Sequence, residues 1–171
     1  MNQLKSYTII GTIFVIILGT LSHFFFEWSD HNFIVGLFTP VNESTWEHMK
    51  LVFFPMLLYF LVIIPNLKRA YPCISSASLS GILLGTLLIP VIFYTYTGIL
   101  GQNFLVLDII TFVLSVVIAF YAVYRLAISC RAHSYSLLLC AAVCFFMICF
   151  LIFTYDPPGI SLFADPTAIS K

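Results

Sequence analysis

The sequence predicts an all-α membrane protein, a bundle of five transmembrane helices with a short interfacial or re-entrant segment between the first two. The chain is 61% hydrophobic and 8% charged, with a mean hydropathy of +1.08, whereas soluble domains carry about a quarter charged residues. Its apolar runs reach about 20 residues, the length that a helix needs to cross a bilayer. The runs are continuous rather than alternating, which argues against a transmembrane barrel.

Five runs are long enough to span a membrane, and together they make one integral membrane domain over residues 1–171. The predicted spanning helices are, in chain order, 7–28, 47–66, 76–100, 104–129 and 136–155. The first run follows Lys5, as a signal peptide would, but no small-x-small cleavage pattern follows it. We therefore expect it to be a retained helix.

Two segments outside the spanning helices are also apolar. Residues 33–38 are six apolar residues, too few to span, and they predict the interfacial or re-entrant segment. In the outer tail 156–171, Ile160, Leu162 and Phe163 need an apolar surface, whereas the prolines around them exclude a helix. We expect this tail to fold back over the outer mouth of the bundle, with a frayed tail at headgroup level as the alternative.

The charges divide between the two sides of the predicted bundle. Cytoplasmic loops of membrane proteins carry an excess of Lys and Arg, so this division predicts a cytoplasmic N-terminus and an extracellular C-terminus in a plasma membrane. All seven acids then face outward, although they were not used in the assignment. The acids are Glu27, Asp30, Glu43, Glu47, Asp108, Asp156 and Asp165, and the bases opposite are Lys5, Lys68, Arg69, Arg125 and Arg131.

Several residue types receive a structural interpretation. The five cysteines contain no Cys-x-x-Cys and are predicted to be small packing residues rather than disulfide partners. Trp46 is predicted to belong to the outer aromatic belt. Gly81 and Gly85 predict a close helix contact. Pro55 and Pro90 predict kinks that open the outer half of the bundle. The lipid bilayer is the expected partner, and the absence of a basic stripe excludes nucleic acid.

The outer side contains a constellation of histidines and acids. His23 and Glu27 are four residues apart and share one helix face. Ser44 and Glu47 have capping-box spacing at the start of the second helix, and Lys50 follows Glu47 closely enough to pair with it. These structural roles explain Glu47, but they do not explain Glu43 and His48, which lie beside it at the same depth.

The constellation predicts a polar pocket that opens to the outside. Its candidate divalent-metal ligands are His23, Glu27 and His48, with a carboxylate from the neighbouring acids completing a mixed nitrogen and oxygen set. An intramembrane carboxylate is expensive unless it is paired or hydrated, which makes Asp108 a functional candidate. The remaining predicted pocket residues are Glu43, Glu47, Asp108 and Asp156.

Three functions fit this constellation. The acidic pocket could bind or transport a small cationic solute, because carboxylates attract cations to a vestibule. It could be the centre of a metal-dependent, hydrolase-type membrane enzyme in which a further carboxylate acts as the general base. The third hypothesis is a structural or accessory membrane protein in which the same residues form hydrogen-bonded ties between helices.

The string Pro40-Val41-Asn42-Glu43-Ser44-Thr45-Trp46-Glu47-His48 resembles a family of small bacterial integral-membrane proteins known as domain of unknown function 6512. The stretch from His23 to Trp28 and the closing Tyr155-Asp156-Pro157-Pro158 are similar to the same family. The resemblance implies a multi-helix membrane domain over nearly the whole chain. It carries no activity, substrate or cofactor to the residues named above.

Overall fold

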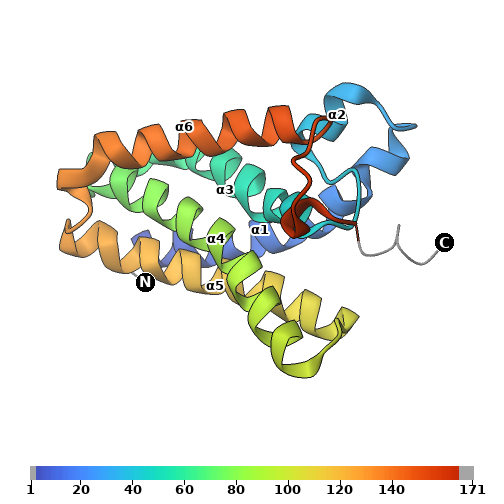
Figure 1. Cartoon of the computed structure of the whole chain (residues 1–171). Helices are drawn as coiled ribbons and strands as arrows, with labels where there is room; N and C mark the ends of the chain where they lie inside the picture. The colour runs from blue at the N-terminus through green and yellow to red at the C-terminus, as the bar shows by residue number, and fades with distance from the viewer. Residues whose placement is uncertain (1–2, 166–171) are drawn as a thin grey trace.

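The computed structural model describes residues 3–165 and shows an elongated helical bundle (Figure 1). The last six residues of the predicted outer tail, 166–171, lie outside this part. The elements in chain order are α1 (Gln3–Trp28), α2 (Phe33–Phe38), α3 (Thr45–Leu67), α4 (Ile74–Leu100), α5 (Leu105–Ser129), the 3-10 turn η1 (His133–Tyr135), α6 (Ser136–Phe153) and the 3-10 turn η2 (Ser161–Phe163).

The predicted all-α fold is confirmed. Within the described residues, five helices are long and apolar enough to cross a membrane, and they coincide with the five predicted runs. The first helix begins at Gln3 rather than at residue 7, and every other end lies within two residues of its predicted position. The segment 33–38, predicted to be interfacial or re-entrant, forms a separate short helix with Asn32 as its N-cap.

The helices alternate in direction, which gives the bundle two ends of different charge. Helices α1, α4 and α6 end where α3 and α5 begin; we call this the acidic end, because all seven acids belong to it by chain order. The opposite end, with the α3–α4 and α5–α6 connections, is called the basic end. Helix α3 packs against α1, α4 and α5 and has more buried residues than any other helix of the described chain.

Small residues allow the helices to approach closely. A Cβ added at Gly19 of α1 would lie 2.6 Å from the Leu51 carbonyl oxygen of α3 and 2.6 Å from the Phe112 ring of α5. A Cβ at Gly85 of α4 would lie 2.9 Å from the Cβ of Ala119 on α5. The close contact predicted for the glycine pair of α4 is therefore confirmed, and it joins two helices of one chain.

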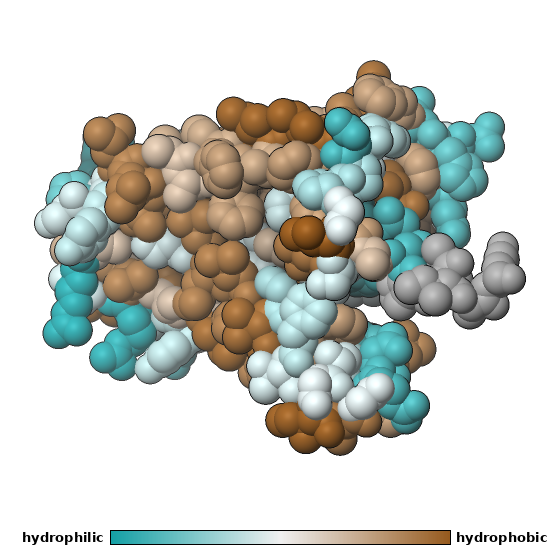
Figure 2. All heavy atoms as spheres, viewed as in Figure 1, coloured by the Kyte–Doolittle hydropathy of each residue, from teal (hydrophilic) through white to brown (hydrophobic). Residues whose placement is uncertain are grey.

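The outside of the bundle is apolar between its two ends. Figure 2 shows hydrophobic residues along the visible sides of the helices and hydrophilic residues gathered toward the ends. This distribution is what a bilayer requires, since lipid-facing side chains must be apolar.

The acidic end of the α4–α5 hairpin leans away from the other helices, as Figure 1 shows. Pro90 lies inside α4, and a proline in a helix removes a backbone hydrogen bond and allows a bend. The outer opening predicted from this proline agrees with the observed divergence.

The cysteine prediction is wrong for two of the five residues. Cys73 and Cys130 form a disulfide with a Cα–Cα distance of 5.4 Å, joining the two connections of the basic end. The physical reason is the helix order, which brings together two loops 57 residues apart in sequence. Cys140, Cys144 and Cys149 of α6 are free, as predicted.

The tail after α6 folds back onto the bundle, although it covers Trp46 rather than the polar pocket. The Phe163 ring lies 4.8 Å from the Trp46 ring, measured between centroids, and the Phe150 ring of α6 lies 4.6 Å from it. Trp46 is consequently buried, so its assignment to the aromatic belt is wrong. Three aromatic neighbours, including Phe153, enclose it at the start of α3.

Candidate metal site at the acidic end

Three side chains from different parts of the chain meet at the acidic end. His23 lies near the end of α1, Glu43 in the connection before α3, and His48 in the first turns of α3. One ligand atom from each lies within 4.8 Å of the others, and among the described residues these three form a group that could hold a metal ion. The two imidazole rings are 5.4 Å apart between centroids.

The distances within this group are longer than charge-assisted hydrogen bonds. Glu43 Oε2 lies 3.5 Å from His23 Nε2 and 3.4 Å from His48 Nε2, whereas such hydrogen bonds are about 2.7–2.9 Å long. Zinc holds nitrogen and oxygen ligands at about 2.0–2.2 Å, so the ligand atoms of a tetrahedral site stand about 3.4 Å apart. The two separations from Glu43 match two edges of that tetrahedron.

The ring of His48 is oriented by the backbone of its own helix. Its Nδ1 lies 2.9 Å from the Ser44 carbonyl oxygen, and a carbonyl only accepts, so Nδ1 carries the hydrogen. Nε2 is then directed toward Glu43. Metal-binding histidines commonly donate their second ring nitrogen to a carbonyl or carboxylate in this way, which fixes the tautomer and the ring plane.

Electrostatics keep Glu43 ionised. Hydrogen-bonding contacts with His23 and then His48 lower the pKa of the Glu43 carboxyl well below its ordinary value, and they outweigh partial burial, which acts in the opposite direction. The side chains of this group are between one quarter and one half exposed. A charged carboxylate and two accessible imidazoles are the state that a metal ion requires.

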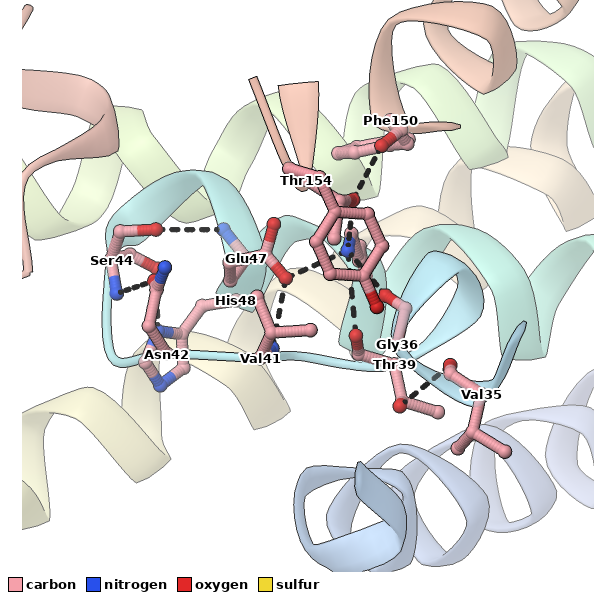
Figure 3. A network of polar contacts seen from close by, with 12 residues as sticks. Val35, Gly36, Thr39, Val41, Asn42, Ser44, Glu47, His48, Phe150 and Thr154 are labelled. Carbon is pink, nitrogen blue, oxygen red and sulfur yellow. Dashed lines mark hydrogen bonds and ion pairs between the residues drawn. The ribbon is translucent and has the colours of Figure 1, made fainter. Parts of the chain in front are cut away.

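A buried ion pair supports the connection that carries Glu43. Lys50 is 1% exposed and Glu47 2% exposed, and Lys50 Nζ donates to Glu47 Oε2 at 2.7 Å (Figure 3). Lys50 also donates to the Gly36 carbonyl at 3.0 Å and to Thr154 Oγ1, at the end of α6, at 2.6 Å. The pair thereby ties α2, α3 and α6 together.

The same oxygen of Glu47 accepts the Val41 amide at 3.0 Å. Asn42 Oδ1 accepts the Ser44 amide at 2.9 Å, and Ser44 Oγ caps α3 through the Glu47 amide at 3.3 Å. The predicted N-cap is confirmed, but Glu47 reaches Val41 rather than the Ser44 amide of a capping box. The residues on both sides of Glu43 are therefore fixed.

The predicted pocket residues lie in different places. A pocket of about 260 Å³ opens beside the three-residue group and is lined by His23, Phe24, Phe26, Glu27, Pro40, Val41, Asn42 and Glu43. Glu27, a predicted metal ligand, is an exposed wall residue of this pocket, and Glu43 meets the histidines instead. Glu47 lies outside it as the partner of Lys50, and Asp156 lies exposed beyond α6.

Asp108 is close to the group without being one of its three members. It lies in the first turn of α5, accepts a short hydrogen bond from the Tyr96 hydroxyl of α4, and acts electrostatically on His48.

The sequence analysis did not predict the hydrogen bonds from Lys50 to Gly36 and Thr154. The available signal was a lysine within an apolar helix, three residues after an acid.

A family model described as a family of unknown function, DUF6512, matches residues 1–170. The chain belongs to this family. No curated protein and no solved structure matches the chain. The description of DUF6512 carries no activity, so the function must be argued from the site itself.

Proposed function

We propose that this member of DUF6512 binds a divalent transition-metal ion, of the zinc class, through His23, Glu43 and His48. The observation that carries the proposal is the arrangement of the three ligand atoms, in which Glu43 Oε2 lies 3.5 Å from His23 Nε2 and 3.4 Å from His48 Nε2, distances that fit a tetrahedral ion better than a charge-assisted hydrogen bond. A metal ion is a small cation, so this proposal gives a more specific identity to the small cationic solute expected from the sequence.

Three protein ligands leave a coordination position open, which is typical of catalytic rather than structural zinc. The open position has room beside it, because His23 and Glu43 also line the pocket. Beneath the site the helices are tightly packed, with Gly19 against Leu51 and Phe112. This packing favours an ion that stays at the acidic end over one that passes through the bundle.

The charge distribution supports an orientation with the metal site outside. Four bases at the basic end and Lys5 near it favour a cytoplasmic N-terminus and an extracellular acidic end in a plasma membrane. The disulfide at the basic end favours the opposite orientation, with the basic end outside, since disulfides persist in oxidising compartments. We give more weight to the five charges. Labelling of Lys68 in intact cells by a membrane-impermeant amine reagent would contradict this orientation.

The metal content of the purified protein tests the binding proposal. After incubation with Zn²⁺ and removal of free ions, we expect about one zinc per chain by elemental analysis. Glu43→Gln, which keeps the shape of the side chain, and His48→Ala should each lose the ion. His133→Ala, in η1 at the basic end, is the matched control and should keep it.

Two results would overturn the proposal. One is wild-type protein without bound zinc. The other is zinc retained in full by both site variants while their helical circular dichroism matches that of the wild type.

A further inference from the structure

We propose that the metal site hydrolyses the acyl ester of a membrane-resident lipid, with Glu27 as the general base and Phe24 as the wall along which the lipid enters. This inference rests on the proposed metal binding and adds a reaction and a substrate class to it. It is carried by the composition of the pocket, by its charges and by its position beside a lipid-facing surface.

One wall of the pocket supplies a base. Glu27 and His23 are four residues apart on α1 and line the same pocket, but Glu27 is not one of the three converging ligands. It is exposed. A carboxylate beside an open coordination position is the arrangement in which a metal-bound water can lose its proton.

A second part of the pocket wall, formed by Phe24, is apolar and continuous with the exposed apolar surface of α1. Phe24 lines the pocket, is 44% exposed, and stacks on Trp28 with the ring centroids 5.8 Å apart; Trp28 is 65% exposed. Below them Ile17 and Leu21 continue the same exposed stripe of α1 at helical spacing. Aromatic residues at helix ends lie at headgroup level, where the ester bonds of glycerolipids also lie.

Charge selects the type of ester. The described residues that line the pocket include two carboxylates, Glu27 and Glu43, and neither Lys nor Arg. Lys50, the described base of the acidic end, is buried against Glu47. A phosphate group would meet carboxylates without a basic partner, whereas the carbonyl of a carboxylic ester is neutral. The pocket therefore favours acyl esters with a neutral or zwitterionic headgroup.

The reaction is balanced without any oxidant or reductant. The metal-bound water gives a proton to the Glu27 carboxylate, and its oxygen forms a bond to the acyl carbon. The bond between the acyl carbon and the alcohol oxygen then breaks, and that oxygen takes the proton from Glu27. The products are a fatty acid and the corresponding lysolipid alcohol.

Fatty-acid release by the zinc-loaded protein tests this inference, with phosphatidylcholine in mixed micelles as one substrate and a water-soluble short-chain ester as the other. We expect release from both. Glu27→Gln should keep its zinc and lose about a hundredfold or more in rate on both substrates, the size of a typical general-base effect. Phe24→Ser should lower the ratio of lipid to soluble-ester hydrolysis about tenfold, because the variant loses the apolar surface that would contact the acyl chain. Phe145→Ser, an exposed phenylalanine of α6, is the matched control and should leave the ratio unchanged.

The outcomes separate the two proposals. A protein that binds no zinc contradicts the proposed metal binding. A protein that binds one zinc but releases no fatty acid overturns the present inference alone. Loss of zinc in Glu27→Gln overturns the role of Glu27 as a base, and an unchanged substrate ratio in Phe24→Ser overturns entry along that wall.

Discussion

Glu43 and Glu47 are four residues apart at the acidic end, and the structure gives them opposite surroundings. Glu47 is buried, and one of its oxygens accepts hydrogen bonds from Lys50 and the Val41 amide. Glu43 is almost half exposed and lies between two histidines at distances too long for strong hydrogen bonds. The difference teaches that an acid in an apolar chain is structural where a fixed cation neutralises it, and available for a ligand where none does.

The largest effect is expected from breaking the buried pair. Lys50→Met should destabilise the protein by about 3–5 kcal/mol, because it leaves the Glu47 carboxylate buried without its cation. Thermal unfolding in detergent would measure the loss. Lys68→Met, at an exposed position, is the control and should change the stability by less than about 0.5 kcal/mol.

A double variant distinguishes the stability contributed by the Lys50–Glu47 pair from the cost of burying one unpaired charge. Glu47→Leu combined with Lys50→Met should recover much of the lost stability, since an apolar pair of similar volume can replace a buried ion pair. A single variant as stable as the wild type would contradict the structural role assigned to Glu47 and Lys50.

A smaller effect is expected where α1 meets its neighbours. Gly19→Ala should cost about 1–3 kcal/mol by overpacking, since its Cβ would press on the Leu51 carbonyl and the Phe112 ring. The same shift should move His23 away from His48 and weaken zinc binding, which calorimetric titration would show. Gly98→Ala of α4 meets nothing within 4 Å and should leave both quantities unchanged; an equal loss in both variants would contradict the packing argument.

The pH dependence of zinc binding should distinguish the imidazoles from the carboxylate. Metal binding displaces protons from histidine, so the zinc affinity should fall about tenfold or more between pH 7.5 and 5.5. Glu43 does not cause this loss, because its histidine contacts lower the pKa of its carboxyl from the ordinary 4.5. A lowered pKa stabilises the folded protein above about pH 4.5, and that contribution is lost only as the pH falls toward the lowered value.

Titration calorimetry at several pH values would measure this affinity. A constant affinity over the range would contradict histidine ligation. A loss that begins only below pH 4.5 would assign the binding to carboxylates alone.

The sequence was sufficient for the fold because the bilayer imposes its own rules. A run such as 104–129 has to be a spanning helix, since no other structure satisfies its backbone within lipid, and the observed α5 starts one residue later. The N-cap at Ser44 was equally local, because it depends on residues three apart.

The set of residues that form the site could not be predicted from the local sequence. Which carboxylate meets His23 and His48 depends on the connection before α3, and that connection is held by Lys50 and by Thr154, 104 residues further along the chain. Helix spacing alone favoured Glu27 as a metal ligand, because it shares a helix face with His23. Spacing could not predict the position of Glu43, which lies in a connection. The disulfide of Cys73 and Cys130 depends likewise on which connections become neighbours.

The coordination of bound zinc tests the central claim most directly. A zinc-edge X-ray absorption spectrum of the loaded protein should show two imidazole nitrogens and oxygen ligands at about 2.0–2.2 Å. A folded Glu47→Gln variant should give the same spectrum as the wild type. The Glu43→Gln variant should lose the bound zinc. A spectrum of a zinc ion surrounded by oxygen alone, without imidazole scattering, would contradict the account.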